Sequence, residues 1–216
     1  MPNAVIVDVV RTAGGRRNGV LSGWHPVDLA AEVLMALQKR NNLDPSLVDD
    51  VIMGCVMQVG AQGLNIGRNA VLAAGWPDSV PATTIDRQCG SSQQAYTFAA
   101  QGVMAGAYDV VVAAGVEEMS LVPMGASVSK GVGFPFTEGM NDRYIDQGGL
   151  VPQGISAEMI ADQWGLSRED LDAFGARARQ FAGRARDEGR CDNEIIPVQG
   201  RRRDKETGEV TIEDAP

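Results

Sequence analysis

The sequence has few cysteines and no long apolar run, and both shortages narrow what the protein can be. Its three cysteines, Cys55, Cys89 and Cys191, are an odd number, which argues against a disulfide framework. The start Met-Pro-Asn lacks the basic and apolar regions of a secretory signal. No stretch of about 18 mainly apolar residues occurs, so no transmembrane helix is expected. We therefore predict a protein of the reducing cytoplasm that does not bind membranes and holds no metal.

An excess of positive charge is also missing. The formal net charge is −9 at pH 7, and surfaces that bind nucleic acid or anionic membranes need a positive field. No nucleic-acid partner is predicted. Glycine, in contrast, is abundant, with 26 among 216 residues, which indicates that backbones approach each other closely.

Short apolar runs alternate with helical patterns along the chain. The runs predict strands at residues 4–10, 49–56, 82–86, 109–115 and 193–198, and the apolar periods predict helices at 26–40, 64–75, from about 89, 156–165 and 167–189. Residues 121–154 predict a long loop, and residues 201–216 a charged hairpin. Continuous apolar strands joined through helices predict an α/β fold whose mixed, largely parallel sheet is covered on both faces.

The helix that starts near Cys89 lies in a stretch without any charged residue between Arg87 and Asp109. A solvated helix face normally carries charge, so we expect this helix to be enclosed on all sides. Its start presents unpaired backbone N–H groups and the positive end of the helix dipole, which stabilise an anion. Cys89 at that position is either a nucleophilic thiolate or a small buried apolar side chain, and the residues alone leave both open.

The other candidate side chains have simpler interpretations. Cys55 lies within an apolar strand, which favours a structural role, and Cys191 in a polar turn is expected to be incidental. His25, the single histidine, precedes a predicted helix start; we favour a role in capping or packing over one as a catalytic base.

Three groups of motifs resemble those of thiolases, the acetyl-CoA acetyltransferases and 3-ketoacyl-CoA thiolases. They are "VVRTAGGRRNGVLSG", "GCVMQVGAQGLNIGRNAVLAAGWPDSVPATTIDRQCGSSQQA" with "AAGVEEMS", and "QGISAEMIADQWGLSREDLDAFGARA". The resemblance covers essentially the whole chain. It implies that Cys89 is the acylated nucleophile, that its backbone N–H is an oxyanion donor, and that "Gly115-x-Glu117-x-Met119-Ser120" closes the following strand.

The resemblance also implies a layered thiolase fold with a buried nucleophile helix and an α-rich loop domain. Residues 1–120 would form the N-terminal thiolase domain with an incomplete sheet, and residues 121–216 part of the loop domain that shapes the acyl and coenzyme A site. Acyl-CoA and coenzyme A, as co-substrate, would be the partners, without a covalently bound cofactor. The family forms homodimers and homotetramers, and its members serve fatty acid β-oxidation or the reverse Claisen condensation.

The sequence departs from the family pattern in places that matter for activity. Asp86 stands where Asn, Ser or Thr is usual, and Pro152-Gln153 replaces the His-Met pair of short-chain members, so a longer or branched acyl group becomes plausible. The Gly-His-Pro motif with the activating histidine, the asparagine of an oxyanion hole and the Cys-x-Gly motif do not occur. We expect this chain alone to lack its base and to be inactive without the C-terminal half.

Two alternatives to a thiolase remain from the sequence. One is a ketoacyl-synthase-like condensing enzyme, and the other a noncatalytic acyl-CoA-binding fragment. A cluster of basic residues near the end of the sequence is either an approach for the phosphates of coenzyme A or, as we favour, a solvated helix face. Its members are Arg177, Arg179, Arg184, Arg186, Arg190, Arg201, Arg202, Arg203 and Lys205.

Overall fold

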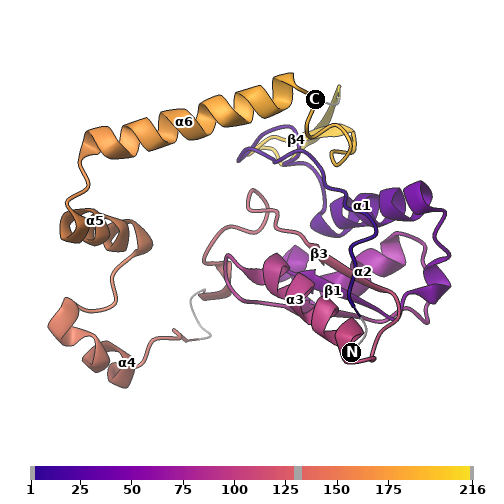
Figure 1. Cartoon of the computed structure of the whole chain (residues 1–216), viewed down its shortest axis with the longest axis horizontal. Helices are drawn as coiled ribbons and strands as arrows, with labels where there is room; N and C mark the ends of the chain where they lie inside the picture. The colour runs from indigo at the N-terminus through magenta and orange to yellow at the C-terminus, as the bar shows by residue number, and fades with distance from the viewer. Residues whose placement is uncertain (1–2, 129–132, 215–216) are drawn as a thin grey trace. The chain divides into compact units, whose positions relative to one another are not determined.

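The computed structural model describes residues 3–128 and 133–214 and divides them into two compact units (Figure 1). Unit 1 comprises residues 1–127 and 193–216, and unit 2 residues 128–192, each within the described ranges. Residues from both ends of the chain therefore build unit 1. The assignment of 1–120 and 121–216 to two thiolase domains stays a prediction.

Three parallel strands form the central sheet of unit 1. β1 (Asp50–Gly54) lies between β2 (Ala82–Ile85) and β3 (Val111–Gly115), with Ile52 opposite Thr83 on one side and Ala113 on the other. Parallel neighbours need long crossover connections, and helices occupy both of them here. The prediction of an α/β fold with a parallel sheet is confirmed for this unit.

Helices cover both faces of the sheet. α1 (Pro26–Asn41) and α2 (Ile66–Ala73) pack on one face, and α3 (Ser91–Met104) packs on the other (Figure 1). The alternation of side chains along β1 matches this arrangement, because Val51 and Met53 belong to the core under α1 and α2, whereas Ile52 packs with Ala95 of α3. All three β1 side chains are at most 3% exposed.

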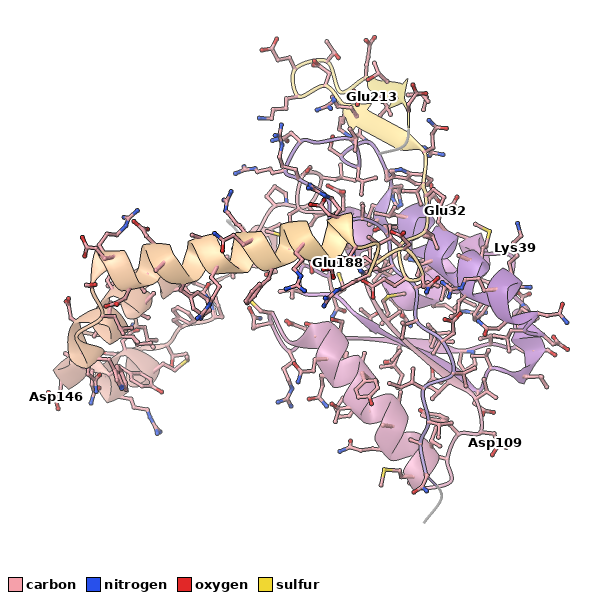
Figure 2. All side chains as sticks on the ribbon, turned by 45° about the horizontal axis from the view of Figure 1, so that its top comes forward. Glu32, Lys39, Asp109, Asp146, Glu188 and Glu213 are labelled. Carbon is pink, nitrogen blue, oxygen red and sulfur yellow. The ribbon has the colours of Figure 1, made fainter. Side chains whose placement is uncertain are left out.

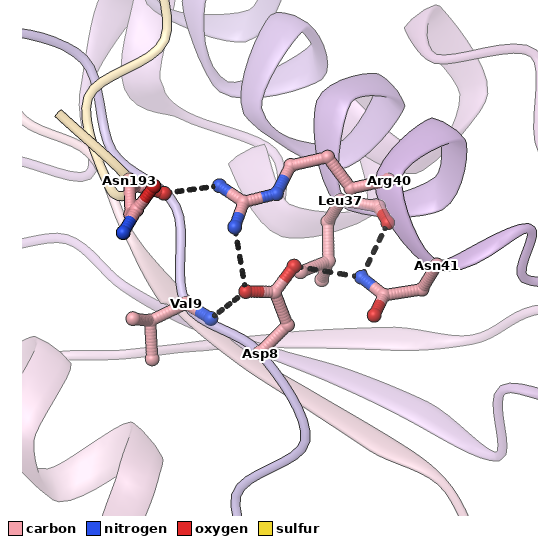
Figure 3. Close-up of polar contacts among 6 residues, drawn as sticks. All are labelled: Asp8, Val9, Leu37, Arg40, Asn41 and Asn193. Carbon is pink, nitrogen blue, oxygen red and sulfur yellow. Dashed lines mark hydrogen bonds and ion pairs between the residues drawn. The ribbon is translucent and has the colours of Figure 1, made fainter.

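The carboxylate of Asp8 fixes the N-terminal segment to α1, and Arg40 of α1 extends the contact to Asn193 (Figure 3). Asp8 accepts hydrogen bonds from the Val9 N–H at 2.8 Å, from Asn41 Nδ2 at 2.9 Å and from Arg40 Nη2 at 3.0 Å. Arg40 Nη1 in turn donates to the Asn193 carbonyl at 2.6 Å. The bond from Asn41, then those from Val9 and Arg40, hold the pKa of Asp8 below its usual value. The contacts connect the two sequence segments of unit 1.

An antiparallel hairpin completes unit 1. β4 (Gly200–Arg203) pairs with β5 (Val210–Glu213), as the sequence predicts for residues 201–216. The Arg201 guanidinium lies 3.7 Å from the centre of the buried Trp24 ring, whose Nε1 donates to the Gln199 carbonyl. Arg202 pairs with Glu213 across the hairpin. These contacts attach the hairpin to the turn before α1.

Unit 2 contains α4 (Glu138–Arg143), α5 (Gln153–Trp164) and α6 (Arg168–Asp187). Ser167 and Asp170 form a capping box at the start of α6, and Gly165 ends α5 in the left-handed region with φ 62°. The predicted loop at 121–154 contains the short α4, which Thr137 caps. Across both units, short 3₁₀ turns lie at Pro45–Leu47, Gly60–Gln62, Ala126–Val128 and Ile145–Gln147.

Two predicted strands are wrong. Residues 4–10 and 193–198 belong to no strand; a single bridge between Arg11 and Ile195 connects the two segments. An apolar run becomes a strand only where the edge of another strand forms hydrogen bonds with its backbone, and the run's own sequence does not show whether such an edge is present. Val5, Ile6 and Val7 are accordingly exposed.

The prediction that α3 is enclosed on all sides is also wrong for this chain. Only Ser91, Ala95 and Ala99 of α3 are buried, whereas Tyr96 and Phe98 are 51% and 42% exposed. The outer surface of α1 carries charged side chains such as Glu32 and Lys39, which Figure 2 labels, but α3 carries none. The absence of charged residues on α3 therefore does not show that the helix is buried, because polar side chains such as glutamine are compatible with water.

Candidate active site

The site lies at the carboxyl ends of the three parallel strands. The segment after β1, the turn after β2 that contains Cys89, and the segment after β3 meet there and enclose a cavity of about 360 Å³. Ligands of open α/β sheets bind at this edge, because crossover loops converge on it. Its lining is Gly54, Cys55, Val56, Met57, Gln88, Cys89, Ser91, Ser92, Gly115, Val116, Glu117, Met119 and Met124.

Cys89 is exposed and lies two positions before the first residue of α3, close to the predicted helix start. The turn that carries it is held by side chains. Asp86 Oδ1 accepts the Gln88 N–H at 2.6 Å, and Ser91 Oγ accepts the Arg87 N–H at 3.0 Å while donating to the Gln88 carbonyl at 2.6 Å. Gln88 has a left-handed backbone with φ 47°, which is uncommon for a residue with a side chain. The turn is therefore fixed in a strained conformation directly before the cysteine.

Two glycines allow this turn to rest directly on the sheet. A Cβ atom at Gly54, the last residue of β1, would lie 2.4 Å from the Ser92 nitrogen, and one at Gly115, the last residue of β3, 2.6 Å from Ser92 Cβ. Real Cβ atoms essentially never come that close. The abundance of glycine thus has the predicted structural meaning here, since it brings the first turn of α3 onto the strand ends.

A buried polar network holds the segments after β1 and β3 together. Gln62, which is fully buried, donates from Nε2 to the Met57 carbonyl at 2.9 Å and to Glu117 Oε1 at 2.8 Å, and accepts the Glu118 N–H at 2.6 Å. The sequence alone gives Gln62 no role and places Glu117 only within a motif. The signal that could have found Glu117 is a charged pair directly after an apolar strand, at the edge where ligands bind.

Comparison with known protein families gives a match over nearly the whole chain. The family described as thiolase, N-terminal domain, matches residues 4–216. The chain belongs to the thiolase family. The resemblance seen in the sequence is confirmed. The prediction that the chain belongs to a family of acyltransferases is confirmed with it.

Several thiolases are similar to this chain over nearly its whole length. The steroid 3-ketoacyl-CoA thiolase FadA6 of Mycobacterium tuberculosis is 43% identical over 222 residues, which cover 100% of the chain and 53% of that protein. The 3-ketoacyl-CoA thiolase of Aliivibrio salmonicida is 42% identical over 92% of the chain and 50% of its own length. That of Shewanella denitrificans is 44% identical over 93% and 50%. The thiolase chain spans about half the length of these relatives.

His25 has the role that we favoured, whereas the basic cluster is divided between a helix and the hairpin. His25 caps α1, with Nδ1 accepting the Val27 N–H at 3.3 Å, and does not line the cavity at Cys89. In the basic cluster, Arg184 pairs with Glu188, and Arg202 pairs with Glu213. The predicted solvated helix face therefore holds for the members on α6, whereas Arg201, Arg202 and Arg203 lie on β4 and are half-buried. Across the described ranges, no helix is long and apolar enough to cross a bilayer.

Cys55 is a buried structural residue, as predicted. It is 1% exposed, and its N–H donates to the Ile85 carbonyl at 3.0 Å. Burial, followed by the negative charges of Glu117 and Asp86, raises its pKa from 9.0 to about 12. A thiol with a raised pKa stays protonated, so it is a poor nucleophile.

This difference predicts selective alkylation. At pH 8, iodoacetamide should modify Cys89 of the folded chain and leave Cys55 unmodified, and raising the pH to 9.5 should not bring Cys55 into reaction, because its pKa of about 12 lies higher still. In urea the burial is lost, the pKa of Cys55 falls towards its ordinary value, and it should react as well. Peptide mass mapping measures the label, and modification of Cys55 before Cys89 would contradict the assignment.

Proposed function

We propose that this thiolase chain carries the nucleophile for reversible thiolytic cleavage of a 3-ketoacyl-CoA through an acyl group on Cys89. The single observation that supports it most is the exposed Cys89 on a side-chain-held turn at the carboxyl edge of the sheet, beside a mainly apolar cavity. The relatives named 3-ketoacyl-CoA thiolases support the substrate class. A thioester acyl chain is apolar at one end, which matches the cavity.

Covalent catalysis then divides the cleavage into two steps. The Cys89 thiolate attacks the C3 carbonyl carbon, so a bond from Sγ to C3 forms and the C2–C3 bond breaks. The electron pair of that bond leaves as the enolate of acetyl-CoA, which takes up a proton. The thiolate of coenzyme A next attacks the acyl carbon, releasing the Cys89 sulfur and the shortened acyl-CoA. The same steps in reverse are a Claisen condensation.

The tetrahedral adduct needs a hydrogen-bond donor for its oxyanion, and we propose the backbone N–H of Cys89. Within the described residues this N–H has no acceptor, while the N–H groups of Gly90 and Ser91 bond to Arg87 and Gln88. The thiol must also lose its proton, and His25 is occupied as a helix cap. Sustained turnover therefore needs a proton acceptor besides these residues.

The proposal includes the wider setting that the resemblance implies. Residues 1–120 act as the N-terminal thiolase domain, and residues 121–216 contribute to a loop domain that binds acyl-CoA and coenzyme A. The whole protein works as a cytoplasmic homo-oligomer in fatty acid metabolism. The cysteine count supports the cytoplasm and the names of the relatives support acyl-CoA as substrate, whereas the oligomeric state rests on the family resemblance alone.

A single-turnover experiment tests the nucleophile. Steady turnover needs the C-terminal half, but a single acylation at alkaline pH needs only hydroxide as the proton acceptor. Under these conditions acetoacetyl-CoA should add one acetyl group to Cys89, seen by intact mass and removed by hydroxylamine. The Cys89→Ala variant should gain no acetyl group, because the attacking sulfur is absent, and the matched Cys191→Ser variant should behave as the unchanged chain. Acetylation of a free thiol but not of Cys89 under the same conditions would refute the proposal.

A further inference from the structure

Glu117 uses both carboxylate oxygens to hold the segment that follows β1. Its Oε2 accepts the Val56 N–H at 2.8 Å, and its Oε1 accepts the Met57 N–H at 3.2 Å together with Gln62 Nε2 at 2.8 Å. The acceptor lies directly after β3 and the donors directly after β1, so the bonds connect two neighbouring strand ends. Hydrogen bonds to an ionised group are about twice as strong as neutral ones.

The carbonyl groups of this backbone have other partners, since the Met57 carbonyl accepts from Gln62 Nε2 and from the Val59 N–H, but its N–H groups depend on Glu117. The Cys55 N–H belongs to the sheet, because it donates to the Ile85 carbonyl. The N–H groups of Val56 and Met57, in contrast, bond to Glu117. The segment leaves the sheet at Cys55, and Glu117 fixes its course from there.

That segment is one wall of the cavity at Cys89. Val56 and Met57 line the cavity on one side, and Val116, Met119 and Met124 are the other large apolar side chains around it. The cavity of about 360 Å³ falls within the ~300–1,000 Å³ typical of small-molecule sites. Methionine side chains adapt to irregular apolar shapes, which suits an unbranched or branched acyl chain.

We propose that Glu117 is a positioning residue that fixes the Val56–Met57 wall and thereby selects apolar acyl chains longer than acetyl at Cys89. The inference rests on the proposed function, because it concerns the acyl group carried by the same sulfur. Glu117 itself lines the cavity, but it takes no part in the bond changes of this mechanism. It acts through the two amide groups that it holds.

Amide hydrogen exchange tests the positioning directly. In the Glu117→Ala variant the Val56 and Met57 amides should exchange at least about tenfold faster, since each loses an ionised acceptor. The Cys55 amide, bonded to the Ile85 carbonyl, should change little and serves as the internal control. Glu117→Gln preserves the side-chain volume and serves as the test if the alanine variant does not fold. Because the amide has only one acceptor oxygen, at least one of the Val56 and Met57 amides should lose its hydrogen bond and exchange faster. Unchanged protection at both amides in a folded variant would overturn the proposal.

Reagent length tests the selectivity. Alkyl methanethiosulfonates transfer an alkylthio group to Sγ of Cys89 and release methanesulfinate, so a methyl and an octyl reagent differ only in chain length. Relative to a free thiol, the octyl-to-methyl rate ratio at Cys89 should be raised at least roughly tenfold, the smallest discrimination that one methylene gives in an apolar pocket. In Glu117→Ala and Glu117→Gln the ratio should return to that of the free thiol, with the methyl rate within about twofold of the unchanged chain.

The control and the outcomes separate this inference from the proposed function. Glu209→Gln changes an exposed glutamate between β4 and β5 and should keep the full ratio. Equal loss of the methyl and octyl rates in the Glu117 variants, or an unchanged ratio, would overturn the inference, because a purely structural role lowers both rates alike. Failure of acetoacetyl-CoA to acylate Cys89 while the ratio still depends on Glu117 would overturn the proposed function and leave the positioning role standing.

Discussion

Replacing Gly54 with alanine should lower the rate of Cys89 acylation about a hundredfold, the loss that a displacement of about 1 Å causes in a positioned group. The added Cβ would lie 2.4 Å from the Ser92 nitrogen and 2.5 Å from the Ser91 carbonyl carbon. Both are backbone atoms of the first helical turn and cannot rotate away. The turn must move, and Cys89 moves with it. Overpacking of this kind should also lower the free energy of unfolding by about 2–3 kcal/mol.

A glycine-to-alanine substitution on α6 is the matched control, and it should change the free energy of unfolding in the opposite direction. Gly175 lies within α6 and has no atom within 4 Å of its would-be Cβ. Gly175→Ala should raise the free energy of unfolding by about 0.5–1 kcal/mol, since alanine loses less conformational freedom in a helix. Urea unfolding and single-turnover acylation measure both variants. Normal acylation of Cys89 in Gly54→Ala would show that the strand end does not position the turn.

Replacing Gln62 with leucine should cost about 3 kcal/mol of folding free energy, because buried polar groups that lose a partner cost roughly 1–3 kcal/mol each. The amide is fully buried and serves the Met57 carbonyl, Glu117 Oε1 and the Glu118 N–H at once. Leucine has a similar size, so the loss reports on hydrogen bonds rather than on volume. Urea unfolding should show a lower midpoint with an unchanged slope.

Gln93→Leu provides the comparison for this prediction. Gln93 is exposed on α3, so the same change there should alter the free energy of unfolding by no more than about 0.5 kcal/mol. A loss at Gln62 no larger than that at Gln93 would mean that water replaces the amide without penalty. The network would then have no role in stability.

The parts of the fold that the sequence predicts well are those in which one segment carries its own information. β1 and β3 follow from continuous apolar runs, β2 follows from a short run rich in β-branched residues, and α6 follows from its capping box and apolar period. Cys89 was placed near a helix start on the same local grounds. Each of these features depends on residues that are close together in the sequence.

The failures concern properties that depend on distant partners. Residues 4–10 have the composition of a strand, but pairing depends on an edge elsewhere in the chain. The lack of charge on α3 was taken for enclosure, although a neutral surface is compatible with solvent. Gln62 and Glu117 are 55 residues apart, so nothing local predicts that they share a hydrogen bond. Only the crossing of the parallel strands brings them together.

The order of the parallel strands also has a consequence for the time at which this site forms during folding. β1 comes first in the sequence but lies in the middle, so both of its partners are made later in the chain. Pairing of such distant segments is slow, because conformational entropy is lost in closing a long loop before native contacts form to compensate for that loss. The thiol, its cavity wall and the glutamate that holds the wall come from the segments that follow three different strands. They therefore take up their final arrangement late, once the last strand has docked.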